Sequence, residues 1–221
     1  MKLVSPLFST PLCFTEGEIL SLVIENQTCF RRFLSDLYSQ AEGLDGNAIL
    51  SRNNKPVVIS KSVEILDEYI NFDMNRKPLL SKISSFLESE AVNATNYERT
   101  QFLLSEWERY IYDLSFSLPC NVSCSKLSIS SLLKAGGLSV TLDTKDVLES
   151  IIQYMNTIRD LDTEKLYVFI NLRSYYSDEK MNAFCETASF HKHTILLVES
   201  VARPSLKREK RLTIDKDWCE I

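Results

Sequence analysis

The sequence predicts an α/β fold, in which a mostly parallel sheet is built from both ends of the chain and an α-helical segment is inserted between them. Short, almost unbroken apolar runs occur near both ends, as is typical of strands that are covered on both faces. The middle of the chain instead carries apolar residues at helical spacing. Only five glycines and six prolines occur among the 221 residues, too few for a loop-rich β-sandwich.

The first 60 residues are predicted to begin this sheet. Residues 20–25 (LSLVIE) form an apolar run that indicates a buried strand, and apolar residues between 30 and 37 then follow a helical spacing that Gly43 ends. Asn53 and Asn54 separate two further apolar runs, which predicts a hairpin.

Residues 61–136 are predicted to form an inserted helical leg. Apolar residues recur at helical spacing over 63–70, over 79–87 behind Pro78, and over 103–114. We expect these helices to be antiparallel and to turn their apolar faces inward.

The strands are expected to return after Gly136 and Gly137, so that residues 1–60 and 137–221 make one discontinuous head domain. The predicted strands are 138–142, 166–170, 194–198 and the terminal LTIDKDW, and the predicted helices run from 147 to 158 and from Ser177 or Asp178 to about Phe190. This β-α-β-α-β order is the mark of a parallel sheet.

Composition and charge narrow the class of protein. The net charge is −5 and 44% of the residues are hydrophobic, which is ordinary for a globular protein. Neither a signal peptide nor an apolar run of about 18 residues is evident, so we expect no membrane span. The six cysteines lack a scaffold-like spacing, which predicts reduced thiols and a cytoplasmic protein.

The residue types that carry catalysis or metal binding do not assemble into a recognisable motif. The glycine-rich phosphate loops G-x-x-x-x-G-K-[ST] and G-x-G-x-x-G are absent. The only histidines, His191 and His193, are interpreted as parts of an exposed helix-to-strand loop, and Cys120 with Cys124 makes a poor zinc half-site. We therefore predict no catalytic residue, no metal site and no enzymatic activity.

Basic residues are the stronger signal, because they cluster in an acidic chain. Five of them lie between positions 203 and 211, where Glu209 is the only acid. Side chains of this kind bind DNA phosphates without reading sequence. The predicted DNA contacts are Arg31, Arg32, Lys55, Lys61, Lys134, Arg203, Lys207, Arg208, Lys210 and Arg211.

The order of these blocks resembles the Csn2 family, the small accessory proteins of type II-A CRISPR–Cas loci. The most specific parts are the strand VFIN at 168–171 followed by a capped helix, and the terminal IDKD at 214–217. The resemblance implies a P-loop-ATPase-like head without a Walker motif, a helical leg, and a homotetrameric ring. It further implies that linear double-stranded DNA threads the ring from an end, without sequence preference. The implied role is spacer acquisition, alongside the CRISPR integrase proteins and the RNA-guided effector nuclease.

One stretch departs from the family pattern. Family members carry carboxylates between the last long leg helix and the LLK-x-x-G segment, and these bind calcium. From Leu114 to Leu127 this chain has no Asp or Glu, only neutral oxygens such as those of Ser117, Asn121, Ser123 and Ser125, beside the cation of Lys126. Calcium prefers several hard, charged oxygen ligands, so no cofactor is expected here.

Two other functions remain open from the sequence alone. One is a nucleotide-dependent enzyme on the same sheet, with an unrecognised phosphate loop. The other is a protein-interaction scaffold that uses the leg helices for docking and does not bind DNA.

Overall fold

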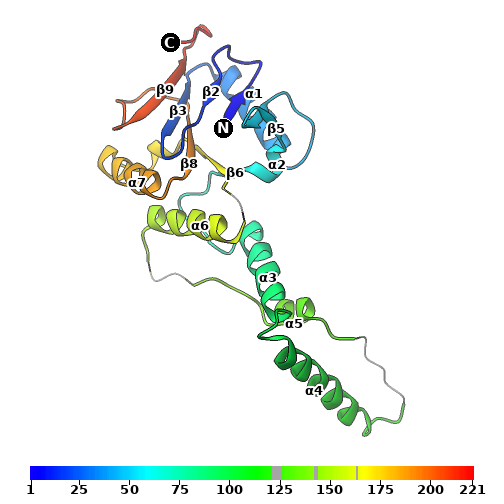
Figure 1. Ribbon diagram of the computed structural model, residues 1–221. Coiled ribbons are helices and arrows are strands. Elements are labelled where there is room, and N and C mark those ends of the chain that lie inside the picture. The colour runs from blue at the N-terminus through cyan, green and yellow to red at the C-terminus, as the bar shows by residue number, and fades with distance from the viewer. Residues whose placement is uncertain (121–125, 142–143, 163) are drawn as a thin grey trace. The chain divides into compact units, whose positions relative to one another are not determined.

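The computed structural model describes residues 1–120, 126–141, 144–162 and 164–221. The chain divides into two compact units, an α/β unit made of Met1–Phe72 with Thr144–Ile221, and a helical unit, Asp73–Asp143 (Figure 1). The predicted α/β fold class with an inserted helical segment is thereby confirmed.

The α/β unit is built on a five-stranded sheet in the order β6-β7-β8-β3-β9, in which every neighbouring pair is parallel. Its strands are β3 (Ile19–Ile24), β6 (Val63–Leu66), β7 (Leu166–Ile170), β8 (Thr194–Glu199) and β9 (Glu209–Ile214). All residues of β3 and β8 are buried, as expected of central strands that are covered on both faces.

Alternate side chains of each strand enter two different cores. On one face, Leu166 and Val168 of β7 pack in a cluster with Phe33 and Leu37 of α1 (Gln27–Ala41). This cluster also covers the small antiparallel sheet β2-β1-β4-β5, made of β1 (Lys2–Val4), β2 (Leu12–Cys13), β4 (Ile49–Arg52) and β5 (Lys55–Val57). The expected hairpin at Asn53 and Asn54 is confirmed by β4 and β5, because both asparagines adopt the positive φ that such a tight turn requires.

On the other face, the remaining β7 side chains meet α6 (Val147–Leu161) and α7 (Asp178–Phe190). The hydroxyl of Tyr167 donates to the Met155 carbonyl oxygen at 3.3 Å, and the Phe169 ring meets the Phe184 ring edge-on with centroids 5.5 Å apart. A 3₁₀ turn, η1 (Leu172–Ser174), joins β7 to α7. The helices predicted over 147–158 and 177–190 are confirmed, and Ser177 is the N-cap of α7.

The prediction was wrong for residues 63–70 and 138–141. Residues 63–66 form β6 rather than a helix, and Ile70 lies in an exposed loop. A short apolar run fits the period of a helix as well as that of a strand. The buried carboxylate of Glu64 is tolerated in β6 because Tyr154 donates to it at 2.9 Å and the ammonium of Lys165 lies 3.4 Å away.

Because β6 belongs to the sheet, the unit boundary lies at residues 72–73 rather than 60–61. The second boundary lies at 143–144 rather than 136–137, and residues 138–141 form no strand. Residue 142, the last residue of the predicted strand, lies outside the described part of the chain.

The helical unit contains α3 (Lys77–Ala91), α4 (Tyr97–Ser115) and α5 (Ile129–Ala135). Pro78 occupies the first turn of α3, as predicted, where its missing N–H costs nothing. The apolar stripe of α4 does not turn inward as expected. Leu103, Trp107, Tyr110 and Leu114 are 56%, 47%, 55% and 51% exposed, so this chain leaves an apolar helix face uncovered.

The C-terminal residues contact the N-terminal segment of the α/β unit through hydrogen bonds. The predicted terminal strand exists as β9, but β9 begins at Glu209 and ends at Ile214, and residues 215–218 of the expected LTIDKDW form a turn. After that turn, Glu220 bridges Ile214. The Glu220 carboxylate accepts hydrogen bonds from the backbone amides of Ser9 and Thr10. These bonds lower the pKa of Glu220, with the amide of Ser9 contributing most.

The structure places His193 in the core rather than in the exposed loop that the sequence suggested. The His193 side chain is fully buried at the start of β8, and its Nε2 lies 2.9 Å from the Asn156 side-chain oxygen. Burial, and then the nearby cation Arg159, lower its pKa to about 4.

We predict that this histidine makes the protein sensitive to mild acid. An unfolded imidazole takes up a proton below pH 6.5, whereas folded His193 does so only near pH 4. The contribution of His193 to the free energy of unfolding should therefore fall by about 3 kcal/mol between these pH values. Because burial raises the pKa of Glu199 to about 7, that carboxyl changes stability in the opposite direction over this range, and the His193 effect is the difference between wild type and variant. Urea unfolding of the wild type and His193→Gln at several pH values measures this. An equally steep loss in the variant, which keeps a donor for Asn156 but cannot titrate, would contradict the assignment.

Candidate nucleic-acid interface

The basic segment 203–211 runs from the end of β8 into the start of β9. A buried arginine from another element anchors it. Arg173 in η1 is only 3% exposed, and its guanidinium donates to the Pro204 carbonyl oxygen at 2.7 Å and to Asp178 at 2.8 Å. It also lies 3.8 Å from the fully buried side chain of Glu209.

The same arginine binds the end of β8. The Arg173 backbone amide donates to the Glu199 carboxylate at 3.2 Å. Burial raises the pKa of Glu199 to about 7, although the amide and guanidinium of Arg173 oppose the rise. The sequence analysis missed Arg173, because nothing in the stretch INLRS distinguishes a buried arginine from a surface one.

Two of the five cations in the 203–211 segment are closely paired with acids. Lys210 lies 2.8 Å from Glu18, which lowers the pKa of that carboxyl. Arg211 pairs with Glu209 at 2.8 Å and donates to the carbonyl oxygen of Arg203 at 2.6 Å. Arg211 therefore links β9 to the preceding loop, and the charge of Lys210 is balanced by Glu18.

Three residues of the segment remain available to a ligand. Lys207 is exposed, and its pair with Glu186 is long at 3.7 Å. Arg203 is exposed, and its guanidinium donates to the Ser174 hydroxyl at 3.4 Å. Arg208 is exposed in a left-handed turn (φ 60°), and no carboxylate of the described residues lies within 4.0 Å of its guanidinium.

A second group of predicted contacts lies on α1, α2 (Ile59–Ser62) and β5 of the α/β unit. Arg31, Lys55 and Lys61 are exposed, and within the described part of the chain none has a carboxylate at ion-pair distance. Arg32 instead stacks over the Trp218 ring, 5.9 Å from its centroid. α1 packs against α2, so these cations share one part of the unit.

The ten predicted residues are divided between the two units. Lys134 lies in α5 of the helical unit, exposed to solvent. The α/β unit carries two separate groups, the 203–211 segment and the group on α1, α2 and β5. Within these groups the structure distinguishes free cations from paired ones, which a list of basic residues cannot do.

The carboxyl edge of the sheet, where nucleotides bind in related α/β folds, has no phosphate loop. After β3 comes Asn26, whose side chain accepts from the Cys29 amide at 3.0 Å and donates to the Lys216 carbonyl oxygen at 2.8 Å. The neighbouring hollow of about 400 Å³ is lined in part by the carboxylate-bearing Glu25. A capped helix start beside an acid is unsuited to phosphate.

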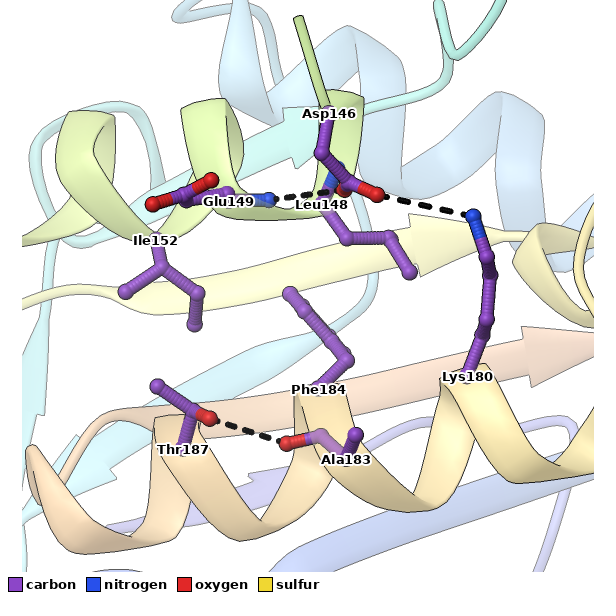
Figure 2. A pocket seen from close by; sticks show the side chains of 8 residues that line it. All are labelled: Asp146, Leu148, Glu149, Ile152, Lys180, Ala183, Phe184 and Thr187. Atoms are coloured by element: carbon purple, nitrogen blue, oxygen red, sulfur yellow. Dashed lines mark hydrogen bonds and ion pairs between the residues drawn. The ribbon is translucent and has the colours of Figure 1, made fainter. Parts of the chain in front are cut away.

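A second hollow, of about 350 Å³, lies between α6 and α7 (Figure 2). Asp146 on its rim caps α6 by accepting from the amides of Leu148 and Glu149 at 2.9 and 3.2 Å, and it lies 3.5 Å from the ammonium of Lys180. Burial opposes ionisation, but these contacts lower the pKa of Asp146 overall. The Asp146 carboxylate is therefore committed to holding two helices together.

Metal-binding residues are not grouped in the described residues, where no cluster of three or more His, Cys, Asp or Glu could share an ion. The neutral oxygens expected in place of a calcium site fall partly outside that part of the chain, at Asn121, Ser123 and Ser125. The absence of a calcium site therefore stays a prediction. The described cysteines 13, 29, 120, 185 and 219 are free thiols.

Comparison with known proteins identifies relatives along nearly the whole chain. Residues 38–218 match the family model described as CRISPR-associated protein (Cas_Csn2). A CRISPR-associated protein Csn2 of Streptococcus agalactiae is 20% identical over 230 residues, covering 99% of this chain and 96% of that relative. The crystal structure of Stu0660 of Streptococcus thermophilus shares the fold, with a TM-score of 0.60 and 13% identity over 97% of this chain and 75% of that one.

We predict that Arg173→Ala destabilises the α/β unit by about 3–5 kcal/mol, because it leaves buried carboxylates without their partner. The free energy of unfolding in urea measures the loss. Arg31→Ala is the matched control, since Arg31 is exposed, has no acidic partner among the described residues, and should change stability by less than about 0.5 kcal/mol. Equal effects of the two substitutions would contradict the anchoring role of Arg173.

Proposed function

This chain belongs to the Cas_Csn2 family of CRISPR-associated proteins, and from this premise we propose that it assists spacer acquisition in antiviral defence. In this proposal it holds the ends of linear double-stranded DNA, without sequence preference, inside a homotetrameric ring. It acts in the cytoplasm, with the CRISPR integrase proteins and the RNA-guided effector nuclease as its partners, and it is not an enzyme.

The observation that carries the DNA-binding proposal is the set of unpaired cations on the α/β unit. Arg31, Lys55, Lys61 and Arg208 are exposed and lack acidic partners among the described residues, although the chain as a whole has a net charge of −5. Cations without partners attract phosphates more strongly than paired ones. A duplex with one negative charge per about 1.7 Å of axis would gain from several copies of such a modest patch.

The proposal of a ring is supported by the uncovered apolar stripe on α4. A contiguous apolar helix face is unfavourable in water and is typical of a protein–protein interface. A second copy of this chain offers an identical stripe, so self-association would bury both. We propose that direct apolar contacts of this kind hold the ring together without calcium.

The two other functions are less well supported. A nucleotide-dependent enzyme would need a phosphate loop before α1, but the sequence has no glycine-rich loop there and the Asn26 side chain accepts from the Cys29 amide. A scaffold without DNA binding would leave the unpaired cations unexplained. No helix among the described residues is long and apolar enough to cross a membrane.

We predict that the unpaired cations, rather than the whole basic segment, determine DNA affinity. Changing Arg31, Lys55 and Lys61 together to Gln should weaken binding of a linear duplex on any sequence. It should also flatten the dependence of log K on log salt by about one unit per lost phosphate contact. Fluorescence anisotropy over a salt series measures both quantities.

The matched control for this experiment is Lys192→Gln, because Lys192 is equally exposed but lies 3.4 Å from Glu16. An unchanged salt slope in the triple variant would exclude this face as the DNA contact. Linear duplex should bind and closed circular duplex should not; equal binding of both would contradict threading from an end. No binding of either, at low salt, would favour the scaffold.

We predict that Leu103→Glu with Trp107→Glu reduces the molar mass of the assembly, because charges at two central positions of the stripe oppose its burial. Light scattering coupled to size-exclusion chromatography measures the mass, with and without EDTA. The control is Ser105→Glu, which adds a charge to α4 about 200° around the helix from Leu103. A mass that falls in EDTA, or that is unchanged in the double variant, would contradict assembly by apolar contacts alone.

A further inference from the structure

The end of α7 presents an aromatic ring to solvent beside two of the basic residues. The buried stripe of α7 consists of Met181, Phe184, Cys185 and Ala188. Phe190 lies on the opposite side of the helix from Met181 and is 83% exposed. It lines a hollow of about 340 Å³, whose other residues are Gly17, Ile19, Cys185, Glu186, Ser189, Lys207 and Arg208. A single exposed Phe is common on protein surfaces. An exposed ring beside two cations in one hollow is the feature that indicates a binding site.

The floor of this hollow is held in place by the turn that precedes β3. The hydroxyl of Ser189 donates to the Gly17 carbonyl oxygen. Gly17 has φ 75°, and a Cβ at this position would meet the Ser189 carbonyl oxygen at 3.1 Å, so only glycine fits here without strain. Beneath it, burial raises the pKa of the Cys185 thiol to about 12, which makes that sulfur unreactive.

The end of α7 is fixed just after Phe190. Lys192 adopts the left-handed conformation, with φ 62°, and the amide of His193 donates to the Ala188 carbonyl oxygen at 3.0 Å. This closes the helix in the manner of a Schellman motif. The ring of Phe190 is therefore displayed from a rigid position rather than from a frayed helix end.

The cationic rim is attached to the same helix. The backbone amide of Lys207 donates to the Asn182 side-chain oxygen at 2.9 Å, which ties the basic turn to α7. The Lys207 side chain is 75% exposed and its pair with Glu186 is long, so that pair contributes little and can exchange for a phosphate. Arg208 has no acidic partner among the described residues.

We propose that this hollow takes an unpaired nucleotide at the end of a DNA strand, with its base stacked on Phe190 and its phosphate bound by Arg208 and Lys207. An aromatic platform beside cations is the arrangement that binds single-stranded nucleic acid, and it tolerates any base because every base has a π face. A purely apolar partner would gain nothing from two cations, and a free anion would gain nothing from the ring. This inference deepens the proposed binding of DNA ends and rests on it.

The test compares one blunt 30-base-pair duplex with the same duplex carrying four-nucleotide 3′ or 5′ overhangs, by fluorescence anisotropy. We expect at least one overhang to bind about five-fold to a hundred-fold more tightly than the blunt end, the range for a stacked base. Phe190→Ala should abolish this ratio and leave binding of the blunt duplex unchanged, whereas Phe190→Trp should preserve it. Arg208→Gln should reduce the ratio as well as the salt dependence.

Several outcomes would overturn the inference. They are equal affinity of the wild type for blunt and overhanging ends, or an overhang preference that survives Phe190→Ala. Because Phe190 is 83% exposed, the substitution should leave the thermal midpoint unchanged, so unfolding cannot imitate the expected result. Binding of a labelled single strand that depends on Phe190, without any binding of duplex, would contradict the proposed function while supporting the hollow. No binding of any DNA would exclude both.

Discussion

The arrangement of the α/β unit around its basic segment depends on one buried arginine. Arg173 contacts the start of α7 through Asp178, the start of β9 through Glu209, and the loop between β8 and β9 through the Pro204 carbonyl oxygen. Its backbone amide also binds Glu199 at the end of β8. A buried guanidinium is costly to desolvate, and it is tolerated because Nη2 donates to a carboxylate and a carbonyl oxygen while the carboxylate of Glu209 lies 3.8 Å from Nη1. Nε has no hydrogen-bond partner among the described residues. The loop from β8 to β9 thus has a defined path, and with it the positions of Lys207 and Arg208.

That fixed path explains how an acidic protein can present selected cations. Acids that are distant in sequence, Glu18 and Glu186, meet the basic segment once the chain has folded. Lys210 is neutralised at 2.8 Å and Arg211 is used internally, whereas Arg208 is left without a partner among the described residues. The segment is consequently less basic than its sequence suggests, and its free charge is concentrated at the turn next to Phe190.

The parallel sheet could be predicted from the sequence because β3, β7 and β8 are nearly unbroken apolar runs, whose burial dominates any local propensity. β6 could not be predicted in this way, because Glu64 interrupts its apolar run. The buried carboxylate is acceptable only because Tyr154 and Lys165, about a hundred residues away in the sequence, contact it in the folded protein.

Charge density along the chain likewise located the basic segment but could not show which cations are paired. The burial of His193 could not be predicted either, because its partner Asn156 lies in α6, far away in the sequence. A helical projection of α7 would have shown from the sequence that Phe190 lies off the apolar stripe and is exposed.

The carboxyl edge of the sheet uses several of its backbone amides for contacts within the protein. At the ends of β3, β7 and β8, one such amide each donates to a side chain of this unit. Asn26 takes the Cys29 amide after β3, and the Tyr69 hydroxyl takes the Ile170 amide at the end of β7. Asn171, in a left-handed conformation, accepts from the Ser200 amide after β8 at 2.8 Å. Amides that are bound in this way stabilise the fold and are not free to bind a ligand. In the proposed function, exposed cations on α1, α2, β5 and the β8–β9 turn contact the phosphates instead, by charge rather than by the shape of a nucleotide pocket.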